Sequence, residues 1–329
     1  ANSTAYNSLK ISSETIGHRL TGSENGKKAE QFAFDLLKSY GFTNLRFQPF
    51  EVESWSRGTL EVTIGGDMNN LKTIKSVSLA HSPVKVDPAL EVVDMGNGVE
   101  EDYAANPNKV KDKIALVYLG VLPGSKPGTP GLHRSEKTAL AIQHGAIGVI
   151  FVNTVKGQVL LTGTASVTGE LIPIPAVCVS VESGKAIRKW IRDEQNILAI
   201  IDMQNFSRPI KSRNIVATIP GTSRKLRKEK IVIGGHLDSW DLATGAIDNG
   251  IGAFSIIDMA RVFKSTQLQP KRTIEFVLFM GEEQGLLGSK YLVSKYKSDK
   301  KLDEVKFYGN DFSEWVIRNK IEAFFPNLL

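Results

Sequence analysis

The hydrophobic and polar positions near the start of the chain follow two different periods. Residues 5–40 are predicted to be helical, and within them NGKKAEQFAFDLLKSYG (25–41) places apolar residues three or four positions apart and ends on Gly41. The next two segments, TNLRFQPFEVESW (43–55) and GTLEVTIGG (58–66), alternate apolar and polar residues one by one. That alternation predicts strands with one buried face.

From about residue 70 to 205 the pattern changes to short apolar runs, loops and a few helical segments. Strands are predicted at DKIALVYLG, IGVIFVN and IPIPAVCVSV, and helices at SEKTALAIQHGA and ESGKAIRKWIRD. This strand–helix alternation has apolar content of its own, so it predicts a separate domain. We therefore expect three regions, namely residues 1–68, an insert at 69–205, and residues 206–329.

The last region again alternates strands with helices. KIVIGGHLD (230–238) predicts a strand, IGAFSIIDMARVFKS (251–265) a helix, and KRTIEFVLFMGEEQG (271–285) a strand. The apolar residues of that last strand are nearly continuous, which is typical of a sheet covered on both faces. The predicted fold class is α/β with an open, mostly parallel sheet, and such sheets bind ligands at the carboxyl ends of their strands.

Composition narrows the possible partners. The 41 basic and 35 acidic side chains give a net charge of +6, and the excess lies in SRKLRKEK (223–230) and SKYKSDKK (294–301). Such runs are usually solvated, and they lack the interleaved aromatic residues of a nucleic-acid site, so no nucleic-acid partner is expected. No apolar run approaches the ~18–20 residues of a membrane span. The single cysteine, Cys178, lies in a predicted buried strand and is expected to pack in a core.

Ligand-type side chains follow two of the predicted strands. His236 and Asp238 end one strand, Asp248 follows in a glycine-rich turn, and Glu282 and Glu283 end the next strand. Carboxylates with one imidazole suit a divalent metal, chiefly zinc. Adjacent glutamates on an extended segment point apart, so one can bind metal while the other faces substrate. Each feature alone is common, and a lone histidine at a strand end is more often structural, but their co-location favours a metal site.

Three motifs together resemble the M28 zinc peptidases, the aminopeptidase and glutamate-carboxypeptidase group. They are GGHLDSWD (234–241), GAIDNGIGA (245–253) and FMGEEQGLLGSKYL (279–292), and the first points to the carboxypeptidase Q branch. The insert at about 70–205 resembles a protease-associated domain. The resemblance implies a mostly parallel-sheet zinc-peptidase domain, a phosphorylase/hydrolase-like sandwich, that carries an inserted α/β protease-associated domain.

The resemblance also implies a role for each residue of the cluster. His236 would bind one zinc, Asp248 would bridge two zincs and Glu283 would bind the second, while Glu282 would be the general base for the attacking water. Asp238 lies two residues after His236, and it would orient the imidazole, as carboxylates behind metal-bound histidines do. In family members the bond after the bridging aspartate is often cis, which here is Asp248–Asn249.

Two further family ligands would come from later in the chain. Asp311, 28 residues after Glu283, is the candidate for a third carboxylate ligand. The family also supplies a late histidine, and no histidine follows His236 in this sequence. The resemblance therefore predicts a chain that is incomplete at its C-terminus.

The activity implied is that of a di-zinc exopeptidase that hydrolyses short peptides or dipeptides from a free terminus. It implies a secreted or otherwise extracytoplasmic enzyme, with a homodimer as a possible assembly. Two other functions stay open. Another two-metal hydrolase, such as a phosphoesterase, uses similar ligands, and a non-catalytic binding protein on the same fold would explain the missing histidine. A serine hydrolase or P-loop enzyme is not indicated, because neither GxSxG nor GxxxxGK[ST] occurs.

Overall fold

The computed structural model describes residues 3–86, 89–194 and 196–310. Contacts divide the chain into two compact units: the described parts of Ala1–Ser54 and Pro209–Leu329 form the first, and those of Trp55–Arg208 form the second. Both boundaries fall inside long strands, β1 (Leu45–Gly65) and β9 (Leu198–Ile219). Within the described residues, none of the helices combines the length and apolar character that a membrane crossing requires.

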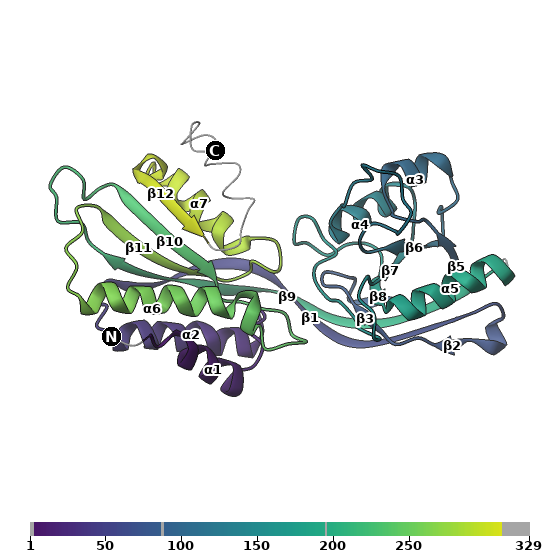
Figure 1. Cartoon of the computed structure of the whole chain (residues 1–329), viewed down its shortest axis with the longest axis horizontal. Helices are drawn as coiled ribbons and strands as arrows, with labels where there is room; N and C mark the ends of the chain where they lie inside the picture. Colours follow the sequence, from purple (N-terminus) through teal and green to yellow (C-terminus); the bar gives the residue numbers. More distant parts are fainter. Residues whose placement is uncertain (1–2, 87–88, 195, 311–329) are drawn as a thin grey trace. The chain divides into compact units, whose positions relative to one another are not determined.

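The first unit is a mixed sheet with helices on both faces. Its sheet runs in the order β12, β10, β11, β9, in which β10 is parallel to β11 and β12, and β11 is antiparallel to β9. Figure 1 shows α1, α2 and α6 on one side of this sheet and α7 on the other. The remaining elements of the unit have these bounds: α1 Ala5–Thr15, α2 Glu24–Ser39, β10 Lys230–His236, η2 Ala246–Gly250, α6 Ile251–Ser265, β11 Thr273–Phe279, α7 Leu287–Ser298, η3 Leu302–Glu304 and β12 Val305–Asn310.

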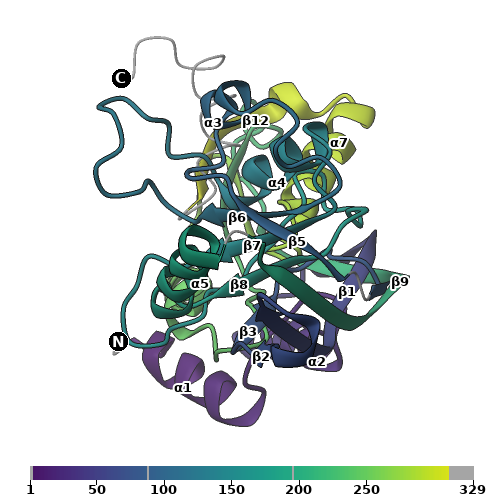
Figure 2. The same cartoon turned by 90° about the vertical axis from the view of Figure 1, so that its right-hand side faces the viewer.

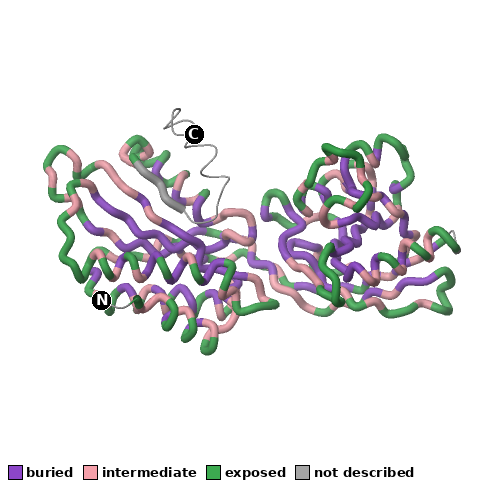
Figure 3. Tube along the Cα trace, in the orientation of Figure 1, coloured by how far each residue is buried: buried purple, intermediate pink, exposed green. Residues whose placement is uncertain are grey.

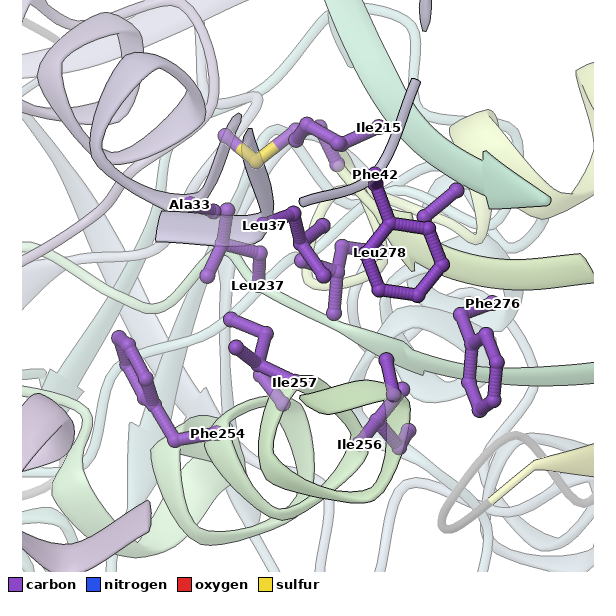
Figure 4. Close-up of a cluster of buried hydrophobic side chains, with 14 of the residues drawn as sticks. Ala33, Leu37, Phe42, Ile215, Leu237, Phe254, Ile256, Ile257, Phe276 and Leu278 are labelled. Atoms are coloured by element: carbon purple, nitrogen blue, oxygen red, sulfur yellow. The ribbon is translucent and has the colours of Figure 1, made fainter. Parts of the chain in front are cut away.

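The core of the first unit lies on both faces of β11. All seven residues of β11 are buried, as the continuous apolar run predicts. On one face Phe276 and Leu278 pack with Leu37 of α2 and Ile257 of α6, a cluster shown in Figure 4. On the other face Val277 and Phe279 pack with residues of α7. Each such buried side chain stabilises the fold by about 1.5–3 kcal/mol, so β11 is anchored in the core on both of its faces.

The N-terminal region is not one helical run. Two helices, α1 and α2, are separated by residues 16–23, with Gly17 at φ +79° and Gly22 at φ +89°. A side chain is strained at such angles, so both glycines let the chain leave one helix and enter the next. Ser23 then caps α2 by accepting a hydrogen bond from the Gly26 N–H.

The second unit is a smaller α/β layer structure. Strands β5 to β8 are parallel neighbours in chain order, and β3 and the first part of β9 pair antiparallel at the two sides. Figure 2 shows α5 on one side of β6, β7 and β8, and α3 and α4 on the other. The bounds are η1 Met68–Asn70, β2 Lys72–Thr73, β3 Ser76–Ser78, β4 Lys85–Val86, β5 Ala89–Asp94, α3 Glu100–Ala105, β6 Ile114–Tyr118, α4 Arg134–Gln143, β7 Gly148–Val152, β8 Ala176–Val179 and α5 Val181–Glu194.

This unit has its own hydrophobic core, which the apolar content of the segment predicts. Strands β6, β7 and β8 are buried along their whole length, as the purple segments of Figure 3 show. Cys178 of β8 is a buried free thiol in this core, so its expected packing role is confirmed. Burial raises the pKa of that thiol to about 11. The sequence indicated an insert over 69–205, and the compact unit runs from Trp55 to Arg208.

Two strands are longer than any apolar run predicts. TNLRFQPFEVESW and GTLEVTIGG, predicted as separate strands, are continuous in β1, and β9 runs unbroken from Leu198 to Ile219. The local sequence predicts a break in each strand, at Gly58 in β1 and at Pro209 in β9, because glycine and proline commonly interrupt strands. The two strands pair with each other, and this long-range pairing keeps both segments extended through those residues.

Candidate metal centre

The parallel pairing of β10 and β11 brings two sets of polar side chains to one edge of the sheet. His236 is the last residue of β10 and pairs with Phe279, the last residue of β11. Beyond them lie two connections, which we call the β10 loop (residues 237–245) and the β11 loop (residues 280–286). The β10 loop leads into η2, which carries Asp248, and the β11 loop carries Glu282 and Glu283.

Three of the predicted ligands converge. His236, Asp248 and Glu283 each offer one ligand atom, and these atoms all lie within 4.8 Å of one another. His236 Nε2 is 3.2 Å from Asp248 Oδ1 and 3.8 Å from Glu282 Oε2. The His236 side chain is 4% exposed, whereas those of Asp248 and Glu282 are 74% and 24% exposed. The imidazole therefore forms the floor of the cluster, and two carboxylates face solvent.

Asp238 lies beneath the cluster with no exposed side-chain surface. Its two carboxylate oxygens accept hydrogen bonds from the backbone N–H groups of Glu282 and Glu283, each at 3.2 Å. His236 Nδ1 lies 3.1 Å from the Asp238 carbonyl oxygen and 3.6 Å from Asp238 Oδ1. The shorter contact to the ring is thus the main-chain oxygen, because the carboxylate holds the β11 loop.

The turn that presents Asp248 needs a glycine at its start. Gly245 has φ +63°, and a Cβ there would lie 2.2 Å from Ser239 Cβ, so a larger residue would displace the β10 loop. The peptide bond between Asp248 and Asn249 is cis, as the family resemblance implies. The side-chain oxygen of Asn249 accepts the N–H of Gly252 in the first turn of α6. Asp248 is therefore held between a tight turn and the start of a helix.

The carboxylates of the cluster shift one another's protonation. Burial, followed by the charges of Asp238, Asp248 and Glu282, raises the pKa of Glu283 to about 9. Burial lowers the pKa of His236, but hydrogen bonds and charge from the same carboxylates outweigh it and raise the pKa to about 11. Four carboxyl groups are thus gathered around one imidazole, with the buried Arg19 guanidinium nearby, and their mutual repulsion disfavours the charged form of Glu283.

The donor set fits zinc. Zinc in proteins binds imidazole nitrogen and carboxylate oxygen, and His236, Asp248 and Glu283 offer both, with their ligand atoms within 4.8 Å of one another. A divalent cation there would also offset the repulsion that raises the pKa of Glu283. Asp311, the predicted third carboxylate, lies outside the described residues.

Two residues that no sequence motif predicts hold the two loops, one residue for each loop. Arg19 and Thr21 lie between α1 and α2, in a stretch predicted to be helical. Arg19 donates hydrogen bonds to backbone carbonyls of the β10 loop, and the Thr21 hydroxyl accepts one from the β11 loop. The only local signal was the pair Gly17 and Gly22, which marks a break in the helical pattern without identifying what the intervening residues contact.

Comparisons with known proteins identify similar families, relatives and solved structures. Residues 214–311 match Peptidase family M28, and residues 86–187 match the PA domain. Carboxypeptidase Q of Xenopus laevis is 26% identical over 302 residues, which cover 91% of this chain and 63% of the relative. A peptidase M28 precursor from Shewanella amazonensis has a TM-score of 0.76 at 25% identity, covering 93% of this chain and 70% of that chain. The zinc aminopeptidase BSAP of Bacillus subtilis has a TM-score of 0.69 at 26% identity, covering 93% and 67%.

The matched regions include the parts of the chain that carry the cluster. The chain spans about 63% of the length of the Xenopus carboxypeptidase Q. His236, Asp248 and Glu283 all fall inside the region that matches Peptidase family M28. The chain therefore carries a peptidase family M28 region at residues 214–311 and a PA domain at residues 86–187.

Proposed function

We propose that this protein is a zinc metallopeptidase that acts as an exopeptidase on short peptides. The observation that carries the proposal is the convergence of three ligand atoms at the strand ends, with Glu282 beside them. The similarity to a zinc aminopeptidase and to a carboxypeptidase Q supports an exopeptidase. We further propose that the substrate is a dipeptide or short peptide recognised by a free terminus, and that the enzyme works outside the cytoplasm.

In this proposal His236, Asp248 and Glu283 would hold zinc, and Asp248 would be the ligand shared with a second ion. Asp311 is the proposed further ligand, because the strand before it, β12, runs parallel to β10 and so leads to the same edge of the sheet. When bound, zinc supplies a Lewis acid that polarises the scissile carbonyl and lowers the pKa of water toward neutrality. The site is therefore suited to hydrolysis of an amide.

Each protein side chain has a defined task. Glu282 takes the proton of the attacking water on its carboxylate and returns it to the nitrogen of the leaving amine. Asp238 holds the backbone of Glu282 and Glu283, so that one glutamate faces the metal while the other faces the substrate. The Asp238 carbonyl oxygen accepts from His236 Nδ1, which leaves Nε2 free to bind metal.

Replacing Glu282 by glutamine tests this mechanism. Glu282→Gln removes the base but keeps the size of the side chain, so we expect dipeptide hydrolysis to fall by about 10²–10⁴-fold while bound zinc is unchanged. Glu304→Gln, in η3 of the same unit, is the matched control and should keep both properties. Zinc is measured by elemental analysis and hydrolysis by release of free amino acid.

Three results would contradict the proposal. Full activity of Glu282→Gln would remove the general base from the mechanism. Hydrolysis of a phosphoester without hydrolysis of a dipeptide would indicate a different two-metal hydrolase. Zinc-loaded protein that hydrolyses none of the dipeptides and tripeptides tested would favour a binding protein on the same fold.

A further inference from the structure

Residues Arg19 to Thr21 form a short segment that contacts both loops of the metal centre. We call this segment the strap. It lies between α1 and α2, after the break at Gly17, and Arg19 and Thr21 are fully buried. Neither residue offers a metal ligand, so any effect of the strap on the metal site must act through its hydrogen bonds to the two loops.

Arg19 is fastened to the β10 loop through its whole guanidinium group. Its Nε donates to the Leu237 carbonyl at 2.5 Å, and its two terminal nitrogens donate to the carbonyls of Thr244 and Gly245 at 2.7 and 2.8 Å. Its backbone N–H donates to Ser239 Oγ at 3.0 Å. One planar group thus joins the two ends of the loop: Leu237 follows the ligand His236, and Gly245 begins the turn that presents Asp248.

Thr21 makes the matching contacts to the β11 loop. Its hydroxyl oxygen accepts the Gly281 N–H at 2.7 Å, immediately before Glu282. Its carbonyl accepts from Gln284 Nε2 at 3.2 Å, immediately after Glu283. The residues on either side of the two glutamates, Gly281 and Gln284, are therefore both hydrogen-bonded to Thr21.

From these contacts we propose that Arg19 and Thr21 are positioning residues that fix the His236–Asp248 side of the metal site against the Glu282–Glu283 side. This inference rests on the proposed function only for the identity of the ion. Asp238 links the two loops from below, and the strap links them through a third segment of chain. A metal site tolerates only small errors in ligand position, so loosening either attachment should weaken binding.

The chemistry of the two residues makes the proposal specific. A guanidinium holds three carbonyls in one plane, whereas a lysine ammonium is a point charge on a flexible stem and cannot reproduce that fork. Arg19→Lys therefore keeps the charge beside Asp238 and Glu283 but loses the geometry. Thr21→Val keeps the volume and removes the acceptor, and Thr21→Ser restores the acceptor.

The test measures the zinc affinity of the 329-residue chain and the protection of loop amides from hydrogen exchange. Because partners behind metal ligands typically contribute 10–100-fold in affinity, Arg19→Lys should bind zinc at least 10-fold more weakly. Thr21→Val should lose about 10-fold and Thr21→Ser should recover most of that loss. The control is Arg261→Lys, a largely buried arginine of α6 that pairs with Asp258, and it should bind like the wild type.

Hydrogen exchange of the zinc-free protein separates this inference from the proposed function. Amides of residues 237–245 should exchange faster in Arg19→Lys, and those of residues 280–286 in Thr21→Val, whether or not zinc is the natural ion. If both variants bind zinc as the wild type does and their loop amides exchange at unchanged rates, the proposed positioning role of the strap is wrong. Faster exchange in a protein whose wild type binds no zinc would uphold the positioning role and refute the proposed function.

Discussion

At the scale of single residues, charge and burial decide what the metal cluster can do. Glu283 is surrounded by Asp238, Asp248 and Glu282, and its pKa is raised to about 9, chiefly by burial and then by those charges. The pKa of His236 is also raised, to about 11, because hydrogen bonds and charge from the neighbouring carboxylates outweigh the effect of burial. Groups that perturb one another this strongly, gathered at the ends of parallel strands, are a physical reason to propose a functional site there.

The same scale shows how much of the site could be predicted from the sequence. His236, Asp248 and Glu283 could be found because each stands close to the end of a recognisable strand, and parallel strand ends share one edge. Which oxygen of Asp238 contacts the imidazole could not be predicted, because the carboxylate accepts hydrogen bonds from backbone N–H groups of the distant β11 loop. Arg19 could not be found either, since its partners are backbone carbonyls more than two hundred residues away and carbonyls carry no sequence signal.

A second buried histidine gives the protein a pH-dependent stability outside the metal centre. His81 of the second unit has no exposed surface, φ +67°, and a hydrogen bond between Nδ1 and Thr164 Oγ1. Burial lowers its pKa from 6.5 to about 4. Between these values the unfolded chain binds more protons than the folded chain, so the free energy of unfolding falls as the pH falls through this window.

Replacing His81 by asparagine should remove this pH dependence. Asparagine tolerates a positive φ and can still form a hydrogen bond with Thr164, but it does not titrate. Between pH 7.5 and pH 4 the wild type should lose about 3 kcal/mol more of its unfolding free energy than His81→Asn does. Urea unfolding at several pH values measures the difference. Parallel pH profiles for the two proteins would show that His81 is not buried in its neutral form.

At the scale of elements, short apolar patterns in the sequence predicted where strands form. The lengths of the longest strands depend on pairing between distant parts of the chain. The strands β6, β7, β8, β10 and β11 all occur at the apolar runs that predict them. β1 and β9 are longer than their local patterns, because each extends by pairing with the other. The predicted helical region 5–40 is divided, because Gly17 and Gly22 allow the strap to lie against the strand ends.

The start of α7 is packed against the end of β11, and one glycine makes this contact possible. A Cβ on Gly288 would lie 2.3 Å from Asn214 Oδ1 and 2.4 Å from the Met280 carbonyl oxygen. The Gly288 N–H donates to that same carbonyl at 3.0 Å. Met280 is the first residue of the β11 loop, which carries Glu282, so α7 and the β11 loop share this contact.

Gly288→Ala should therefore destabilise the protein, although alanine favours an isolated helix by about 1 kcal/mol. The added methyl group meets a backbone oxygen that cannot rotate away, and overpacking of this kind costs about 1–3 kcal/mol. Chemical unfolding measures the change. Lys297→Ala, at an exposed position of the same helix, should be nearly neutral. A Gly288→Ala protein as stable as the wild type would mean that α7 does not pack this closely.

At the scale of the whole molecule, the candidate metal site and the PA domain belong to different compact units. Every described residue of the metal cluster belongs to the first unit, and the PA domain lies within the second. Each unit has hydrophobic clusters of its own, so each has the means to stay folded on its own core. The central claim, that the strand ends of the first unit bind zinc, can therefore be tested by changing one ligand without altering either core.

The most direct measurement is the amount of zinc bound per chain after equilibration with zinc and removal of the excess. Asp248 is largely exposed, so Asp248→Ala should remove a ligand without disturbing the core. We expect zinc bound by the wild type and by Asp303→Ala, an exposed aspartate of the same unit, and at least a 10-fold loss of affinity in Asp248→Ala. Equal zinc binding by Asp248→Ala and the wild type, or none by the wild type, would contradict the account.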